Sequence, residues 1–330
     1  MPAPVTTARP HGSVAVRYGV PVTVRVPATT ANLGPGFDSL GMALDLHDEV
    51  TVEAVALEGS AGPTVDVEVC GAGAGTVPLG EDHLVVRSVR AGLARAGAGR
   101  PSLRMRCRNA IPHGRGLGSS ASAVVAGLIA ARGLLVDPEL LDDATVFDLA
   151  TAAEGHPDNA SAAVFGGFTV SWTDEGPTGA VPAAHTVSLP VDPRLRVVVC
   201  VPDGDLATSR ARAMLPATVP HGDAAFNAGR AALLVEAVTR RPELLLAATA
   251  DRLHQEQRAT AMPASAALLR ALRAVGAAAV VSGAGPSILV LGTGSGPVDA
   301  VRQEVARGSG GERWQVLEPA VALRGAHLLT

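Results

Sequence analysis

Apolar and polar positions alternate in several short segments of the first third of the chain, which is the pattern of half-buried strands. These segments are 22–26, 50–55, 65–69 and 103–107. In the last of them, Leu103, Met105 and Cys107 alternate with arginines, so one face of the strand is apolar and the other is charged. We therefore predict an early sheet made mainly of antiparallel strands.

Longer segments repeat their apolar residues every three or four positions and predict helices. The predicted helices are 83–96, one that begins near 119, 142–154, a short one that ends at Gly166, 223–240, 244–259, 264–275 and 298–307. In the second half they alternate with predicted strands at 196–201, 278–282, 287–291, and near Trp314 and Val321. From 196 onward, this order is typical of the split β-α-β-β-α-β unit of ferredoxin-like domains, here with extra helices.

The length of 330 residues suggests two domains, since a domain commonly takes roughly 150 residues. Glycine, proline and threonine dominate after Trp172 until Pro193, and we place the domain boundary there. We predict a flexible tail over residues 1–18, a first domain over 19–190 and a second over 191–330. Segment 176–193 is either a lid or a linker.

The composition excludes several classes of function. All 27 basic residues are arginine, so no Walker A lysine, protein-kinase strand lysine or Schiff-base lysine is present. A net charge of −4 gives no basic excess for nucleic acid or a membrane surface. The longest apolar stretch, 121–136, is shorter than a membrane span, and 1–18 lacks the apolar core of a signal peptide. The three cysteines are widely spaced, so we expect reduced, mostly buried thiols in a cytoplasmic protein.

A glycine-rich turn between a predicted strand and a predicted helix has the parts of a phosphate site. Its residues are Pro112, His113, Gly114, Arg115, Gly116, Leu117, Gly118, Ser119, Ser120, Ala121 and Ser122. Alternating glycines let main-chain N–H groups approach an anion, and the following helix directs its positive end at the same point. The alternative is a tight turn with serine caps. A dinucleotide fold would need glycine where Ser119 stands.

Three further loops are more polar than a turn requires. Segment 28–38 holds Asn32, which an Asx-type turn would explain, and Asp38, which it would not. Segment 154–159 holds Glu154, His156, Asp158 and Asn159 at a predicted helix end, where a plain C-cap would need only the glycine. Segment 282–287 fits a hairpin turn and a second main-chain anion nest equally well.

Together these loops resemble the motifs of the GHMP kinases, which bind ATP phosphates without a Walker lysine. Pro-x-x-x-Gly-Leu-Gly-Ser-Ser-Ala at 112–121 resembles their second motif, 27–38 the first and 283–287 the third. Within this superfamily, segments 31–38, 154–159 and 211–216 are similar to the homoserine kinases. The resemblance implies an α+β GHMP kinase fold, with an N-terminal domain like domain 2 of ribosomal protein S5, a ferredoxin-like C-terminal domain, and an active site in the cleft between them.

The resemblance also implies roles for individual residues. Loop 112–122 would wrap the phosphates of ATP, and Ser120 (or Ser119) with Glu154 would hold Mg²⁺. The ligands of L-homoserine would be Asn32, Asp38, His156, Asn159, Arg212 and Arg258. An α-carboxylate suits the planar fork of arginine, and an α-ammonium suits a carboxylate such as Asp38. The residues expected to act directly in the transfer are Asp38, Arg212 and Ser120, while the identity of a base, for which Asp158 lies near the expected place, stays open.

The reaction implied is transfer of the γ-phosphoryl group of ATP to L-homoserine, giving O-phospho-L-homoserine in threonine biosynthesis, by a homodimer. One alternative keeps the fold and changes the alcohol to mevalonate, a sugar or a diphosphocytidyl-methylerythritol type of substrate. Another is an ATP-binding sensor without turnover. The presence of Arg212 and Arg258 together with His156 and Asn159 argues for an amino acid, since an isoprenoid substrate needs no ammonium site.

Overall fold

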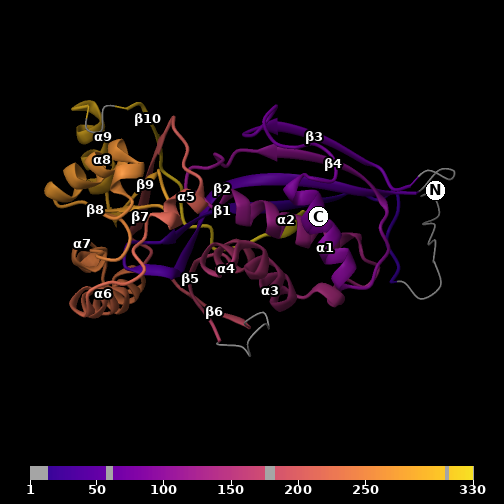
Figure 1. The fold of residues 1–330 in the computed structure, drawn as a ribbon, viewed down its shortest axis with the longest axis horizontal. Coiled ribbons are helices and arrows are strands. Elements are labelled where there is room, and N and C mark those ends of the chain that lie inside the picture. The colour runs from indigo at the N-terminus through magenta and orange to yellow at the C-terminus, as the bar shows by residue number, and fades with distance from the viewer. Residues whose placement is uncertain (1–13, 57–61, 175–182, 309–311, 330) are drawn as a thin grey trace.

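The computed structural model describes residues 14–56, 62–174, 183–308 and 312–329, and it forms two lobes (Figure 1). The sheet of the first lobe runs in the order β11-β1-β2-β4-β3, with β5 paired to β2 and β6 to β5. Its strands are β1 (Val22–Asn32), β2 (Gly36–Val55), β3 (Val65–Gly71), β4 (Ser102–Asn109), β5 (Phe168–Thr173), β6 (Ala184–Leu189) and β11 (His327–Leu329). The β3–β4 pair is parallel and the others are antiparallel, so the predicted, mainly antiparallel sheet is confirmed.

The helices described in the first lobe pack on one face of this sheet (Figure 1). They are α1 (Leu84–Arg95), α2 (Ser119–Leu134), η1 (Pro138–Leu141), α3 (Asp143–Glu154) and α4 (Asp158–Phe165). α2 is apolar on nearly every side and lies in the core, in contact with β1, α1 and α3. On the opposite face the β4 arginines are exposed, and Arg104 and Arg106 form ion pairs with Glu53 and Glu68 of neighbouring strands. The predicted two-faced strand is therefore confirmed.

The second lobe is a four-stranded antiparallel sheet, in the order β10-β7-β9-β8, between two layers of helices (Figure 1). Its strands are β7 (Leu195–Pro202), β8 (Ala278–Val281), β9 (Ile288–Thr293) and β10 (Trp314–Leu317). Its helices are α5 (Thr208–Ala213), α6 (His221–Thr239), η2 (Pro242–Leu244), α7 (Leu245–Ala248), η3 (Ala259–Ala261), α8 (Pro263–Ala274) and α9 (Gly296–Ala306). Val197 and Val199 of β7 pack with residues of α6 and α7, while Val198 and Cys200 pack with α8 and α9. Because side chains alternate along a strand, each face of the sheet packs against one of the two helix layers.

The chain ends differ from the predicted division. Val14 and Val16 form bridges with Ala98 and Leu135 of the first lobe, so residues 14–18 are not a loose tail; residues 1–13 lie outside the described part. β11 pairs with β1, which returns the C-terminus to the first sheet. The predicted second domain 191–330 is therefore wrong for this last segment. Val321 forms a single bridge with Leu44, where a strand was predicted.

The structure also differs from the prediction in single elements. The helix predicted over 244–259 ends early, at Ala248. There the Asp251 carboxylate accepts hydrogen bonds from the main-chain N–H groups of Leu253, His254 and Gln255, and such local bonds compete with helix formation. β6 was not predicted, since it lies in the segment taken as the boundary.

All three cysteines are free, and Cys107 and Cys200 are buried whereas Cys70 is exposed. Burial raises the pKa of both buried thiols to about 12. None of the helices in the described ranges has the length and apolar character to cross a membrane.

Candidate active site

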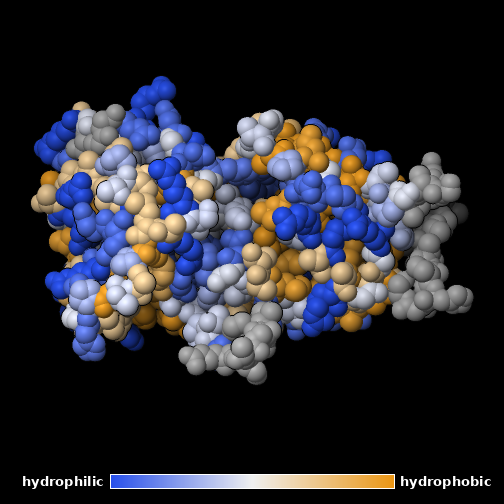
Figure 2. All heavy atoms as spheres, viewed as in Figure 1, coloured by the Kyte–Doolittle hydropathy of each residue, from blue (hydrophilic) through white to orange (hydrophobic). Residues whose placement is uncertain are grey.

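The predicted site residues meet in one cavity of about 160 Å³ between the two lobes. Figure 2 shows the surface hollowed at this junction, where hydrophilic residues gather. The predicted residues that line the cavity are Asn32, Asp38, Gly114, Gly116, Gly118, Ser119, Ser120, Glu154, His156, Asn159, Arg212 and Arg258. They come from segments that lie up to 226 residues apart in the sequence (32 to 258).

Not every residue of the glycine-rich loop faces this cavity. Leu117, Ala121 and Ser122 are buried, and Ser122 Oγ donates a hydrogen bond to the Pro27 carbonyl. The Arg115 guanidinium crosses to the second lobe and donates to the carbonyls of Pro202 and Asp203. Arg115 therefore joins the lobes and does not line the cavity. Pro112 does not line the cavity, and His113 lines a neighbouring one.

The glycines of the loop allow very close contacts. Gly116 has a φ of 71°, and a Cβ added there would stand 2.2 Å from the Ser282 carbonyl oxygen. Ser282 Oγ in turn donates a hydrogen bond of 2.6 Å to the Gly116 carbonyl. Since segment 282–287 also connects β8 and β9 as a hairpin, it serves both as a turn and as a support of the glycine loop.

The N-terminus of α2 opens into the cavity without a side-chain cap. Its N-cap is Gly118, in the left-handed region, and no side chain that the structure describes caps the helix. The serine-cap alternative is thus wrong. The first N–H groups of a helix lack partners within the helix and carry its positive end. The start of α2 at Ser119 and Ser120 is therefore suited to bind an anion.

Ser120, in the first turn of α2, and Glu154, the last residue of α3, are in direct contact. Ser120 Oγ donates to Glu154 Oε1 at 2.6 Å. Burial raises the pKa of the Glu154 carboxyl, and the hydrogen bond from Ser120 opposes this shift. A hydroxyl and a carboxylate side by side are oxygen ligands of the kind that Mg²⁺ takes together with phosphate oxygens and water. The residues present therefore fit a magnesium ion.

Asp38 and Arg212 form an ion pair across the cavity, with Arg212 Nη2 2.7 Å from Asp38 Oδ1 and Nη1 3.0 Å from Oδ2. The hydrogen bond to Asp38 raises the pKa of Arg212 despite partial burial. Asp38 lies near the start of β2, just after a turn that the Asn32 side chain closes. Asn32 Oδ1 accepts a hydrogen bond from the Asp38 N–H, and Nδ2 donates one to the Gly283 carbonyl. Asn32 and Asp38 both have positive φ, a strained backbone conformation that clusters at functional sites.

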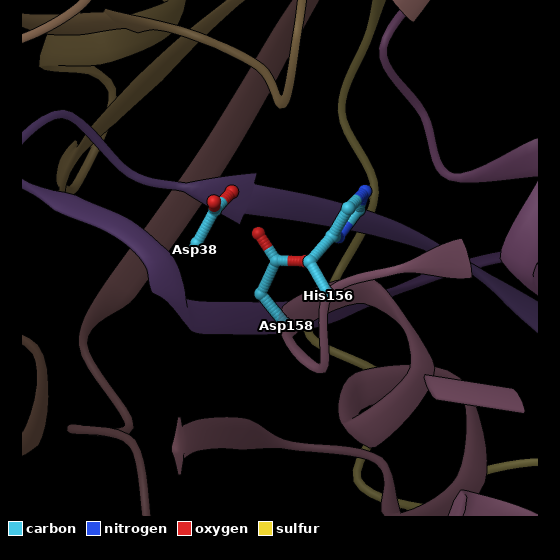
Figure 3. A group of neighbouring side chains, drawn as sticks. All are labelled: Asp38, His156 and Asp158. Atoms are coloured by element: carbon cyan, nitrogen blue, oxygen red, sulfur yellow. The ribbon is translucent and has the colours of Figure 1, made fainter. Parts of the chain in front are cut away.

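His156 and Asp158 lie beside Asp38 (Figure 3). His156 Nδ1 is 2.5 Å from Asp158 Oδ1, and one ligating atom from each of these three residues lies within 4.8 Å of the others. Burial lowers the pKa of His156, but the hydrogen bond and charge of Asp158 outweigh it, and the net pKa is raised. Asp158 Oδ1 also accepts from the Asn159 N–H, so this oxygen is already engaged by two donors.

Arg258 is almost completely buried, with 1% of its surface exposed. Its Nε donates to the Ala211 carbonyl and its Nη1 lies 3.1 Å from His254 Nδ1. Arg258 and Arg212 both lie over the Phe37 ring, 5.4 and 5.6 Å from its centroid. Burial and the charge of Arg212 lower the pKa of Arg258. Phe37 and His254 were not predicted as site residues, although His254 lies only four residues before Arg258.

A second cavity, of about 260 Å³, adjoins the first at the start of α2. Ser119 and Ser120 line both cavities. The lining of the second is mainly apolar, with Val26, Val77, Pro78 and Leu84 beside Asp48, His83 and Asn109. This cavity was not predicted from the sequence, because its walls come from ordinary core positions of several elements.

Comparison with known proteins assigns the chain to a family. The model of the GHMP kinases N terminal domain matches residues 83–167, and that of the GHMP kinases C terminal matches 225–309. The homoserine kinase of Mycolicibacterium smegmatis is 53% identical over 294 residues, which cover 88% of this chain and 91% of that protein. The homoserine kinase of Streptomyces coelicolor is 48% identical, covering 93% and 94%.

Solved structures agree. The crystal structure of homoserine kinase from Cytophaga hutchinsonii has a TM-score of 0.79 and 25% identity, over 94% of this chain and 97% of that chain. A mevalonate kinase from L. major, at 16% identity and a TM-score of 0.62, shares the fold. The predicted α+β fold with N- and C-terminal GHMP kinase domains is confirmed. By its sequence similarity and its two-lobed fold, the chain belongs to the homoserine kinases of the GHMP kinase family.

Proposed function

We propose that this protein transfers the γ-phosphoryl group of ATP to the hydroxyl of L-homoserine, giving O-phospho-L-homoserine in threonine biosynthesis. The observation that carries the proposal is the composition of the cavity between the lobes. One end is the uncapped start of a helix, suited to phosphate, and the other holds two arginines and a carboxylate, suited to an amino acid. Homoserine kinases that are 48–53% identical to this chain support the same substrate.

ATP would bind across the two cavities. The N–H groups at the start of α2 and the glycine bend would hold the phosphates, and the adjoining apolar cavity would take the base. The position of the apolar cavity supports this placement of the base, since Ser119 and Ser120 line both cavities. The triphosphate would thus run past Ser120 toward Asp38 and Arg212.

Ser120 Oγ and the Glu154 carboxylate would hold Mg²⁺ together with phosphate oxygens. The ion, when bound, supplies positive charge that offsets the charge of the phosphates. The contact of 2.6 Å between Ser120 Oγ and Glu154 Oε1 supports Ser120 as the serine ligand. No side-chain hydrogen bond between Ser119 and Glu154 is observed among the described residues.

L-homoserine would replace contacts that the free protein makes with itself. Its carboxylate would bind Arg212 and Arg258, and its ammonium group would bind Asp38. His156, Asn159 and Asn32 would complete the walls around the amino acid. Asn159 is fixed for this role, since its Oδ1 accepts a 2.7 Å hydrogen bond from Thr29 Oγ1.

Transfer then depends mainly on alignment and on neutralisation of charge. Asp38 and Arg212 hold the acceptor, and Ser120 and the N–H groups of α2 hold the donor. We assign no general base, since Asp158 Oδ1 already accepts hydrogen bonds from His156 and the Asn159 N–H. A homodimer in the cytoplasm remains our prediction from the family resemblance.

An assay of ADP release with L-homoserine, L-serine, mevalonate and galactose tests the proposal. We expect Mg²⁺-dependent turnover that is highest with L-homoserine. Turnover only with mevalonate or galactose would show a kinase for another alcohol. ATP binding without turnover on any acceptor would show a sensor, and both results would contradict the proposal.

A further inference from the structure

His254 connects the two lobes behind the amino-acid end of the cavity without lining the cavity itself. Its side chain is fully buried. Nε2 lies 2.8 Å from the carbonyl oxygen of Gly34 in the first lobe, and Nδ1 lies 3.1 Å from Nη1 of Arg258. One imidazole ring thus makes a hydrogen bond on each side.

These two contacts define the protonation state of the ring. An arginine side chain can only donate hydrogen bonds, so Nδ1 of His254 must accept and carries no proton. Nε2 therefore carries the hydrogen and donates it to the Gly34 carbonyl, which can only accept. Burial also favours the neutral form of the ring, since it lowers the pKa of His254.

The ring itself is held in place from two sides. The Asp251 carboxylate accepts hydrogen bonds from the N–H groups of His254 and Gln255, which fixes the turn that carries the ring. The imidazole packs against Phe37 with 5.2 Å between centroids, and Arg258 lies over the same Phe37 ring. His254 therefore has little freedom to follow Arg258 if that side chain turns.

Hydrogen bonds hold two of the three side-chain nitrogens of Arg258. Nε donates to the Ala211 carbonyl and Nη1 to His254. Among the residues that the structure describes, none accepts a hydrogen bond from Nη2. Since Arg258 lines the cavity, Nη2 is the nitrogen left for a ligand.

We propose that His254 is a positioning residue that orients the Arg258 guanidinium toward the α-carboxylate of the substrate. This inference rests on the proposed function. Loss of the acceptor at Nδ1 would free Arg258 to rotate about its terminal bonds. Affinity for the amino acid would then fall, while ATP binding at the other end of the cavity would not change.

Two substitutions separate the two hydrogen bonds. In His254→Asn, the amide oxygen lies near the position of Nδ1 and keeps the acceptor for Arg258, but the bond to Gly34 is lost. In His254→Gln, the amide nitrogen reaches toward the position of Nε2 and keeps the bond to Gly34, but the acceptor for Arg258 is lost. Each variant loses one buried hydrogen bond, so we expect similar decreases in Tm.

Steady-state kinetics gives the readout. We expect His254→Gln to raise the KM for L-homoserine about 10-fold or more, the usual scale for one hydrogen bond to a charged group. Its KM for ATP and its kcat should stay within about 2-fold of the original protein. His254→Asn should leave all three values near those of the original protein. His254→Leu, which has neither polar atom, should raise the KM for L-homoserine at least as much as His254→Gln.

A substrate without a carboxylate provides the control. With 3-aminopropan-1-ol, which lacks the α-carboxylate of L-homoserine, kcat/KM of His254→Gln should equal that of the original protein. Equal effects of the Asn and Gln substitutions on the KM for L-homoserine would overturn the role of His254. A loss of kcat/KM in His254→Gln that is the same with 3-aminopropan-1-ol as with L-homoserine would also overturn it. Neither result would contradict the proposed function. An original protein that is inactive on L-homoserine would overturn the proposed function and this inference with it.

Discussion

Arg212 and Asp38, 174 positions apart in the chain, pair through two hydrogen bonds across the junction of the lobes. These are the side chains that we assign to the carboxylate and the ammonium group of the substrate. In the free protein each charge neutralises the other. A zwitterion that inserts between them replaces the ion pair by two new ion pairs, so the charge of the site is balanced before and after binding.

Asp38→Asn tests this relationship, because it keeps the shape of the side chain and removes its charge. We expect the KM for L-homoserine to rise about 100-fold, since the ammonium loses its counterion and Arg212 is left without its partner. The KM for ATP should change little. Asp45→Asn is a matched control, since Asp45 lies on the same strand and its side chain is 55% exposed. An equal effect of both substitutions would contradict the assignment of Asp38.

Ser120→Ala tests the magnesium assignment and decides between the two serines. We expect kcat to fall about 100-fold or more and the Mg²⁺ concentration for half-maximal rate to rise, because a ligand that helps offset phosphate charge is removed. Glu154→Gln should have the same effect on the Mg²⁺ requirement. Ser119→Ala is the control and should keep nearly full turnover. A larger loss in Ser119→Ala than in Ser120→Ala would move the assignment to Ser119.

Gly116→Ala tests the contact between the glycine bend and the segment around Ser282. An added Cβ would stand 2.2 Å from the Ser282 carbonyl oxygen, so the two loops must separate. Gly276 has a similarly positive φ but open space around it, so Gly276→Ala measures the backbone strain alone. We expect Gly276→Ala to cost about 1–2 kcal/mol in the free energy of unfolding.

Gly116→Ala should cost more than this control and should also raise the KM for ATP. Denaturant titration and ADP-release kinetics measure the two effects. If both variants were equally stable and equally active, the contact with Ser282 would have no part in shaping the phosphate loop.

Asp48→Asn tests a pH dependence of stability. Burial raises the Asp48 pKa from 3.8 to about 6, although its Oδ1 accepts hydrogen bonds from the N–H groups of Ala110 and Ile111 just before the glycine-rich loop. The folded protein therefore holds this proton more tightly than the unfolded chain does. The cost of the buried charge is complete above about pH 6 and disappears as the pH falls toward 4.

Asparagine avoids this cost, because its amide oxygen can accept the same two hydrogen bonds without a charge. We expect Asp48→Asn to be more stable than the original protein at pH 8, by at most about 3 kcal/mol. The difference should shrink below pH 6 in urea unfolding measured from pH 4 to 8. Asp148→Asn, at an exposed position of α3, is the control and should show no such trend. A difference that does not vary with pH would contradict the raised pKa.

The sequence by itself determined the parts of this protein that depend on neighbouring residues. The alternation at 103–107, the apolar helix that begins at Ser119 and the glycine bend at Gly114 to Gly118 all formed as predicted. Periodicity and the conformational freedom of glycine act over a few residues, so they can be read without the rest of the chain. The resemblance to GHMP kinases added the residues that now line one cavity.

Only the tertiary structure decided how distant residues are used. It brings Asp38 to Arg212 and His254 to Gly34, and it forms the apolar cavity beside Ser120. It ends the helix predicted over 244–259 early, since the Asp251 carboxylate accepts hydrogen bonds from main-chain N–H groups there. It also returns β11 to the first sheet. These features depend on burial and on distances between segments that are far apart in the chain. A local pattern of apolar and polar residues carries no information about such distances.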